Sequence, residues 1–202
     1  MSAKVLRLFS TPVLIHEVED ADQLNGKLEQ LIIDKRSQET GVKLSNRGGW
    51  QSGRDFPQWA GKVGQRITRL ALDLASEHSL GPDGKAPPDW VADVWANVSE
   101  AGHFNMPHVH GGSFWSAVYY VRAGEGEGGH LVLHDPRMPG LRMHAPGVHF
   151  KGMGAELRAE IRPRTGLMVL FPAWLSHSVE PWSGEGQRIS IAMNIRARLQ
   201  PR

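Results

Sequence analysis

Three histidines carry the chemistry that this sequence suggests. His108 and His110 are separated by one residue, and residues i and i+2 of an extended segment point to the same side, so both rings can converge on one ion. His177 follows an apolar run, 167–171, and a turn. Three imidazoles suit Zn, Cu, Fe or Ni, and facial nitrogen and oxygen sites with open positions suit non-heme Fe(II). His108, His110 and His177 are therefore candidate catalytic residues and metal ligands.

Arg188 and Ser190 form a second candidate group. They share one face of an expected strand, whose other face carries Ile189 and Ile191. An inward-facing Arg beside a metal site needs an anionic partner, and a bidentate carboxylate fits, with Ser190 adding a hydrogen bond. Alone, the histidine pair could be structural and Arg188 could form an ordinary ion pair. Together, these residues indicate a metal next to a buried carboxylate co-substrate.

The composition narrows the possible classes of protein. The chain has 202 residues, of which 40% are hydrophobic and 22% charged, so we expect one globular domain over residues 1–202. The absence of cysteine excludes disulfides, zinc ribbons, iron–sulfur clusters and thiol catalysis. A formal net charge of +2 is too small to indicate a nucleic-acid partner.

The sequence gives no sign of a membrane segment. No apolar run reaches the 18 or so residues that a membrane-spanning helix needs, and the N-terminal residues lack the apolar region of a signal peptide. We therefore expect a cytoplasmic protein without a membrane partner. Nothing in the pattern indicates its oligomeric state.

The chain changes character near residue 88. Apolar spacing predicts helices over residues 20–37, capped by Asp20 or Asp22, and over residues 57–79. After the loop at 81–88, short extended runs alternate with Gly- and Pro-rich turns. We expect a helical support region, residues 1–88, packed on a β-barrel core, residues 89–202, that carries the metal site. The expected strands are Val5–Val18 at a sheet edge, Trp90–Val98, Phe114–Val121, His130–His134, Leu157–Ile161, Leu167–Phe171 and Arg188–Ile195.

Across these segments the sequence resembles the Fe(II)- and 2-oxoglutarate-dependent oxygenases. It looks closest to their small bacterial and phage branch and shares traits with prolyl-hydroxylase-like members. The resemblance implies a mainly β fold with α-helices, the double-stranded β-helix (a cupin-like jelly roll), with N-terminal helices packed on the major sheet. The matching segments are Leu8–Pro12, Gly48–Ser52, Trp95–Asn97, His108–His110, Ser116–Val121, Gly128–Arg137, Phe171–His177 and Arg188–Ser190.

The resemblance also implies roles for individual residues. His108 and His177 match metal ligands, and Arg188 with Ser190 matches the Arg-x-Ser pair that holds the far carboxylate of 2-oxoglutarate. Tyr120 matches a position that often hydrogen-bonds the same carboxylate, and Asn97 is a further candidate for binding this co-substrate.

One position departs from the family pattern. The family usually has His-x-Asp or His-x-Glu, whereas this chain has His110 as the third residue of the motif. Either the site uses three histidines or a carboxylate comes from elsewhere, with Asp135 as the alternative third ligand. An Asp before Pro136 is, however, also a common turn former.

The implied activity is that of a dioxygenase. It would use Fe(II), 2-oxoglutarate and O2 to hydroxylate a small-molecule or peptide substrate, with release of succinate and CO2. The alternatives are a non-catalytic cupin-like metal-binding module and a three-histidine dioxygenase that does not use 2-oxoglutarate. Arg188 and Ser190 speak against both, since neither needs a carboxylate clamp.

A long basic segment precedes the strand that begins at Leu167. Residues 136–164 contain six Arg or Lys residues, recurring Gly and Pro, and few acidic residues. Long irregular insertions are often functional, so we predict a lid over the metal that favours an anionic substrate or an acidic partner surface. The alternative is an ordinary solvated loop. Arg137 and Arg142 are the residues to test.

Overall fold

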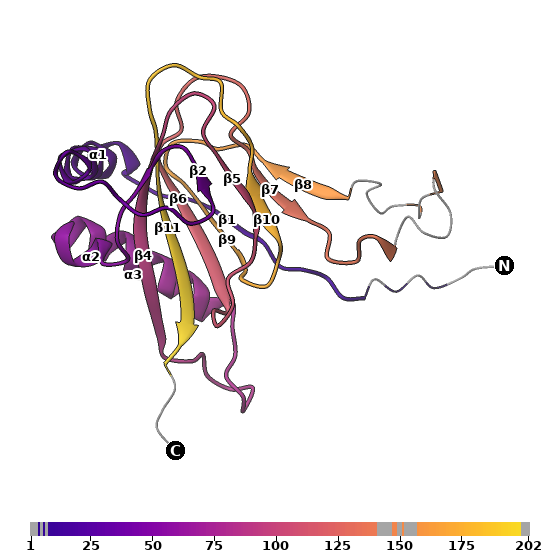
Figure 1. The fold of residues 1–202 in the computed structure, drawn as a ribbon. Coiled ribbons are helices and arrows are strands. Elements are labelled where there is room, and N and C mark those ends of the chain that lie inside the picture. The colour runs from indigo at the N-terminus through magenta and orange to yellow at the C-terminus, as the bar shows by residue number, and fades with distance from the viewer. Residues whose placement is uncertain are drawn as a thin grey trace.

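Two antiparallel sheets face each other, and helices pack on the outer face of the larger sheet (Figure 1). The computed structural model describes residues 4, 6, 8–140, 147–148, 151 and 157–198. The helices are α1 (Ala21–Gln38), α2 (Phe56–Trp59) and α3 (Gly61–Glu77). None of the described helices is both long and apolar enough to cross a membrane.

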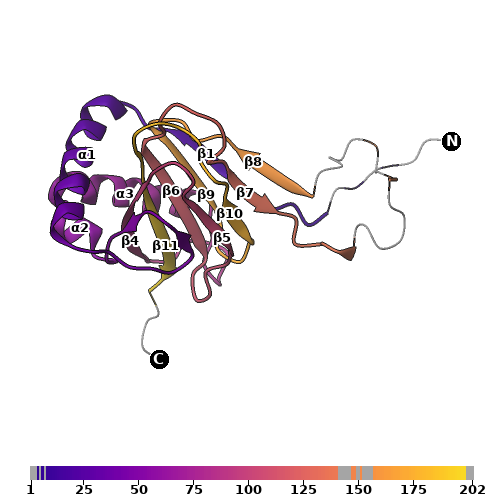
Figure 2. The same ribbon diagram turned by 45° about the horizontal axis from the view of Figure 1, so that its top comes forward.

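The larger sheet has six strands in the order β1-β9-β6-β11-β4-β3. The smaller sheet has five strands in the order β2-β5-β10-β7-β8. Figure 2 shows β7 and β8 extending away from the helical side of the molecule. The strand bounds are β1 Leu14–Glu17, β2 Asn46–Arg47, β3 Trp50–Gln51, β4 Trp90–Ser99, β5 Phe104–His108, β6 Trp115–Arg122, β7 Leu131–His134, β8 Arg158–Ile161, β9 Leu167–Pro172, β10 His177–Val179 and β11 Arg188–Ala197.

Side-chain alternation explains how β11 contributes both to the hydrophobic core and to the candidate site. Ile189, Ile191, Met193 and Ile195 point into the core between the larger sheet and the helices. The intervening positions on β11 therefore point toward the smaller sheet, because successive side chains in a strand alternate between its faces. This alternation directs Arg188, Ser190 and Asn194 into the space between the sheets.

A buried hydrogen bond ties α1 to the larger sheet. The hydroxyl of Tyr119 on β6 donates to Oδ1 of Asn25 on α1 at 2.7 Å. Burial raises the pKa of Tyr119 to about 12, so the hydroxyl keeps its proton. The Nδ2 atom of Asn25 has no hydrogen-bond partner among the described residues, so the bond from Tyr119 is the one side-chain hydrogen bond described for this buried amide.

We expect Tyr119→Phe to lower the free energy of unfolding by about 1–3 kcal/mol, because it leaves a buried amide unsatisfied. Urea denaturation monitored by circular dichroism measures this loss. The double variant Tyr119→Phe, Asn25→Leu removes both polar partners and should recover part of the stability. A single variant as stable as the parent would show that the hydrogen bond contributes nothing.

The expected helices are present, with two corrections. The helix predicted over 57–79 is divided, because Gly61 has a φ of +59°, which ends α2 and starts α3. Asp20 occupies the N-cap position of α1, but its left-handed backbone leaves its side chain without a capping hydrogen bond. Asp22 lies in the first turn instead, where its negative charge interacts favourably with the positive end of the helix dipole.

The strand predictions are confirmed for the strongly apolar segments and wrong in extent for the first one. Among the described residues of Val5–Val18, the strand comprises β1, Leu14–Glu17, and it lies at the sheet edge as expected. Pro12 comes just before β1, consistent with its missing backbone donor. Two short strands that the sequence pattern did not predict, β5 and β10, turn out to carry the site.

Candidate functional site

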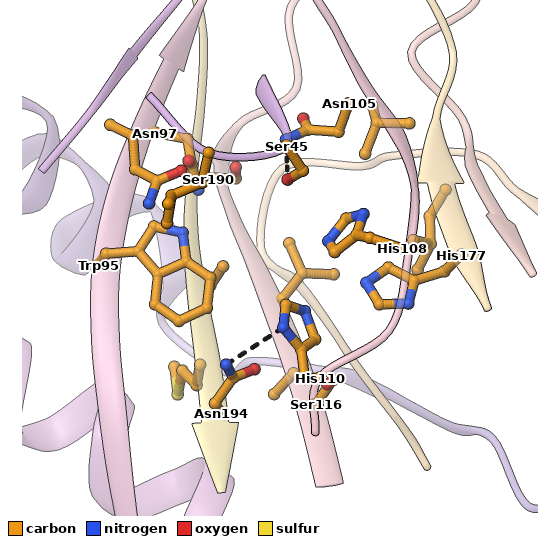
Figure 3. A pocket seen from close by; sticks show the side chains of 18 of the residues that line it. Ser45, Trp95, Asn97, Asn105, His108, His110, Ser116, His177, Ser190 and Asn194 are labelled. Carbon is orange, nitrogen blue, oxygen red and sulfur yellow. Dashed lines mark hydrogen bonds between the residues drawn. The ribbon is translucent and has the colours of Figure 1, made fainter. Parts of the chain in front are cut away.

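A cavity of about 300 Å³ lies between the two sheets, and all three candidate histidines line it (Figure 3). Arg188, Ser190, Tyr120 and Asn97 line the same cavity. The structure thus brings together every candidate site residue of the sequence except Asp135. Further lining residues, which were not predicted to belong to the site, include Gln51, Arg54, Trp95, Asn105, Phe171 and Asn194.

Strand pairing places the three imidazoles side by side. His108 ends β5 and His177 begins β10, and the two residues are direct partners in the antiparallel register. His110 follows in the next turn, where its backbone N–H donates to the Ala173 carbonyl at 3.0 Å. One nitrogen from each ring lies within 4.8 Å of the others. The spacing suits three ligands around a single ion.

Backbone carbonyls orient two of the rings. Nδ1 of His108 lies 2.7 Å from the Met106 oxygen, and Nδ1 of His177 lies 2.9 Å from the Leu175 oxygen. A carbonyl oxygen only accepts, so each Nδ1 must carry the proton and each Nε2 keeps its lone pair. Metal-binding histidines usually have this second partner, which fixes ring and tautomer.

The environment keeps all three rings neutral near pH 7. Burial, together with the neighbouring His108, lowers the pKa of His177 to about 3 and that of His110 to about 4. Burial also lowers the pKa of His108. Neutral imidazole is the form that binds metal ions.

Nδ1 of His110 contacts a side-chain amide, whereas Nδ1 of the other two histidines contacts a backbone carbonyl. Its Nδ1 lies 3.2 Å from Nδ2 of Asn194 on β11 (Figure 3). In this orientation Oδ1 of Asn194 is buried without a hydrogen-bond partner among the described residues, as is the hydroxyl of Ser116, the register partner of Asn194 on β6.

A buried arginine lies at the other end of β11. Arg188 is 5% exposed, and its guanidinium donates to the Gly129 carbonyl at 2.7 Å and lies 5.8 Å from the Tyr120 ring. Within the described part of the chain, no carboxylate forms an ion pair with it. Burial lowers the pKa of Arg188, a sign of how poorly this charge is compensated. The cavity at this end is therefore suited to an anion.

Hydroxyl and amide groups form a row beside Arg188. Ser190 on β11 pairs in register with Tyr120 on β6 and with Asn97 on β4, so the three residues lie in one row across adjacent strands. Burial raises the pKa of Tyr120, so its phenol keeps its proton and can donate. These groups could bind the oxygens of a carboxylate held by Arg188.

Asp135 lies apart from the histidines. The described residues that group with His108 and His177 include His110 but not Asp135. Its Oδ1 accepts hydrogen bonds from the backbone N–H and Nε of Arg137, and its Oδ2 accepts from the guanidinium at 2.6 Å. The Arg137 hydrogen bonds lower the pKa of Asp135. Asp135 thus forms a turn.

Part of the segment predicted to be a lid, residues 141–146, 149–150 and 152–156, lies outside the described residues. Arg142 lies there, and Arg137, which is described, pairs with Asp135 and does not line the cavity. The strand expected at Leu157–Ile161 is present as β8, Arg158–Ile161. A lid over the site stays a prediction.

A second cluster of metal-binding residue types involves His130, Glu160 and Glu180. Arg158 pairs with Glu160 at 2.7 Å and lies 3.8 Å from Glu180. The guanidinium contacts both carboxylates, so we interpret this cluster as an ion-pair network between strands.

Comparison with known proteins identifies the family. Residues 93–194 match the family model described as "Putative 2OG-Fe(II) oxygenase". The chain belongs to this 2OG-Fe(II) oxygenase family. The matched segment contains every lining residue discussed above except Gln51 and Arg54. A search of curated protein sequences finds no significant match for this 2OG-Fe(II) oxygenase family member.

Solved structures share the fold of this family member. A prolyl-4-hydroxylase from Pseudomonas putida superposes with a TM-score of 0.62 at 16% identity, over 94% of this chain and 95% of that one. The 2OG complex of a viral collagen prolyl hydroxylase from Paramecium Bursaria Chlorella virus-1 gives 0.61 at 17% identity, over 93% and 96%. HygX from Streptomyces hygroscopicus, with nickel and 2-oxoglutarate bound, gives 0.62 at 11% identity, over 94% and 84%. The expected double-stranded β-helix fold is confirmed.

Proposed function

We propose that this family member is an Fe(II)- and 2-oxoglutarate-dependent dioxygenase that hydroxylates a C–H bond of its substrate. The observation that carries the proposal is Arg188, a buried cation without a carboxylate partner in the described chain, in the same cavity as three converging imidazoles. A metal-binding module without co-substrate would have no use for this costly charge.

The donor set fits a transition metal such as iron. His108 and His177 present Nε2 with Nδ1 bonded to carbonyls. The Asn194 amide completes the pattern when its oxygen and nitrogen are exchanged, an assignment that hydrogen-bond partners decide. Oδ1 then accepts from Nδ1–H of His110, and Nδ2 turns toward the unpartnered Ser116 hydroxyl. All three Nε2 atoms would then be available to the metal.

The use of His110 in place of a carboxylate changes the charge of the site. Three neutral imidazoles leave the 2+ charge of Fe(II) uncompensated. The keto acid end of 2-oxoglutarate supplies one negative charge to the metal, and its far carboxylate supplies the other to Arg188. Binding of the co-substrate should therefore be favoured by charge at the metal end and by Arg188 at the far end. A three-histidine site is in this way compatible with 2-oxoglutarate.

The roles of the chain's own residues follow from their positions. The bound iron would couple oxidation of 2-oxoglutarate by O2, giving succinate and CO2, to insertion of the second oxygen atom into a substrate C–H bond. Arg188, Ser190 and Tyr120 orient the co-substrate through its far carboxylate, with Asn97 beside them. The aromatic rings of Phe171 and Trp95 pack on His177 and His110 and help to keep water out.

The direct test is anaerobic addition of Fe(II) and 2-oxoglutarate to the metal-free protein. A weak visible charge-transfer band forms only when both bind at one site, and it should require both. Admission of air should then yield succinate in proportion to the enzyme. Metal binding without the band would reject this proposal, and oxygen uptake without 2-oxoglutarate would favour the three-histidine alternative.

We expect Asn194→Ala to weaken metal binding about 10–100-fold, the usual cost of removing a group that orients a histidine ligand. Asn194→Asp keeps an oxygen acceptor for Nδ1–H and should recover most of the affinity. Competition titrations with Zn(II) measure both. The control is Asn105→Ala, which lines the same cavity but bonds Ser45. Equal losses in the Asn194→Ala and Asn105→Ala variants would contradict a specific role for Asn194.

A further inference from the structure

We propose that Arg54 binds a carboxylate of the primary substrate at the mouth of the cavity, so that this oxygenase acts on an anionic substrate. The inference rests on the function proposed above, because it names the substrate class of the same site. Arg188 keeps its role in binding the co-substrate, and the Arg54 site lies in a different region of the cavity wall.

Arg54 and Arg188 lie at opposite ends of the cavity. The Arg54 carbonyl accepts a hydrogen bond from the N–H of Val94, and Val94 pairs in register with Met193, next to Asn194. Arg188 and Asn194 are six residues apart on β11, about 20 Å along an extended strand. Arg54 is therefore level with His110, on the side of the histidines away from Arg188.

Local partners hold each guanidinium at its own end. Arg188 donates to Gly129 near Tyr120, whereas Arg54 lies 3.7 Å from Asp93, the register partner of Asn194. A five-carbon diacid bound to a metal at the histidines can reach only one of these cations. If 2-oxoglutarate uses Arg188, Arg54 remains for another ligand.

Arg54 is only weakly compensated by its neighbours. Asp93 binds Arg196 more closely, at 2.9 Å, so the two arginines share one carboxylate and the group keeps a net charge of +1. No Asp or Glu occurs among the described residues that line the cavity. A single excess charge matches a carboxylate better than a phosphate dianion.

The surroundings of Arg54 suggest the rest of the substrate. Gln51 also lines the cavity and is 4% exposed, but it pairs in register with Asn97 and therefore belongs to the Arg188 end. Leu44 and Val109 line the cavity and are about half exposed, at 54% and 53%. A substrate with an apolar body and one carboxylate would contact these apolar side chains and pair with Arg54.

The test uses hippurate and its uncharged amide, hippuramide, as probes of the Ni(II)- and 2-oxoglutarate-loaded protein, measured by calorimetry. Hippurate should bind about tenfold more tightly than hippuramide, the usual gain from a charge-assisted hydrogen bond, and the difference should shrink at high salt. Arg54→Gln should abolish the difference. Asp93→Asn, which removes the competing carboxylate, should increase it.

A matched variant separates a local effect from a change in overall charge. Arg198→Gln removes an exposed arginine that pairs with Asp89 outside the cavity, and it should bind both probes as the parent does. Equal affinity of the parent for hippurate and hippuramide, or an Arg54→Gln variant that keeps the preference, would overturn the proposal. Lack of saturable hippurate binding would do the same.

The outcomes also distinguish this inference from the proposed function. Binding of 2-oxoglutarate is measured in the same titrations and should be unchanged in Arg54→Gln, which also shows that this variant is folded. If the parent does not bind 2-oxoglutarate, the proposed function fails. The probe measurements are then made with Ni(II) alone, where an Arg54-dependent preference for hippurate supports the anion site by itself.

Discussion

His177→Ala is expected to abolish 2-oxoglutarate-dependent succinate formation and to weaken metal binding about 100-fold or more. Loss of a group that merely orients a ligand already costs about 10–100-fold in affinity, and this change removes a ligand itself. His177 is 5% exposed and lies directly opposite His108 in the strand register, so no neighbouring side chain can replace it. Zn(II) competition and succinate assays measure the two effects.

The matched control is His134→Ala. His134 is a half-buried histidine of the same sheet whose Nε2 bonds the Ser178 hydroxyl, and it does not belong to the triad. This variant should bind metal as the parent does. Parent-like metal affinity in His177→Ala would contradict the assignment of the site.

Variants at His110 test the departure from the family pattern. His110→Ala should weaken metal binding as well, since we propose this imidazole as the third ligand. His110→Asp restores a His-x-Asp motif and should keep a metal site, because a carboxylate is an equally acceptable iron ligand in facial sites. A His110→Ala variant with full metal affinity would show that His108 and His177 suffice.

Part of the site could be predicted because it lies on strands with a strong apolar signal. β9 is buried on both faces, with Met168 and Leu170 in the helix-side core and Val169 and Phe171 between the sheets, and it reads as one continuous apolar run. On β11, alternation with isoleucine assigned Arg188 and Ser190 to one face. Extending the same alternation would have pointed to Asn194.

The remaining parts depend on contacts between distant segments. β10 has three residues and β5 contains Pro107, so neither carries a strand pattern of its own, and only their pairing brings His177 opposite His108. The Nδ1 partners of these histidines are backbone carbonyls, which no residue type encodes. Arg54 lies in the connection between β3 and α2, where local sequence gives no indication of the cavity it joins.

Arg188→Ala is expected to raise the 2-oxoglutarate concentration required for activity about 30-fold to several-thousand-fold. Removing one partner of a buried charge pair costs about 2–5 kcal/mol, and each 1.4 kcal/mol is tenfold in affinity. Arg188→Lys should recover only part of the loss, because an ammonium does not match the planar, bidentate geometry of guanidinium and carboxylate. Calorimetric titration of 2-oxoglutarate into the Ni(II)-loaded protein measures both variants.

The control is Arg122→Ala, which removes an arginine of the same sheet that pairs with Glu29 outside the cavity. Its affinity for 2-oxoglutarate should match that of the parent. An Arg188→Ala variant with unchanged 2-oxoglutarate affinity would reject the role of Arg188 as the carboxylate clamp.

Replacement of Arg188 should weaken 2-oxoglutarate binding without lowering the stability of the free protein. A buried guanidinium without a carboxylate partner is costly in the free protein, and apolar replacements of buried charges are often neutral or stabilising. We therefore expect the Tm of the metal- and ligand-free protein to be unchanged or higher in Arg188→Met. Addition of 2-oxoglutarate should raise the Tm of the Ni(II)-loaded parent but not that of the Ni(II)-loaded variant. A purely structural Arg188 would instead give a lower Tm on replacement and no loss of ligand stabilisation. The combination distinguishes a residue retained for anion binding from one retained for folding.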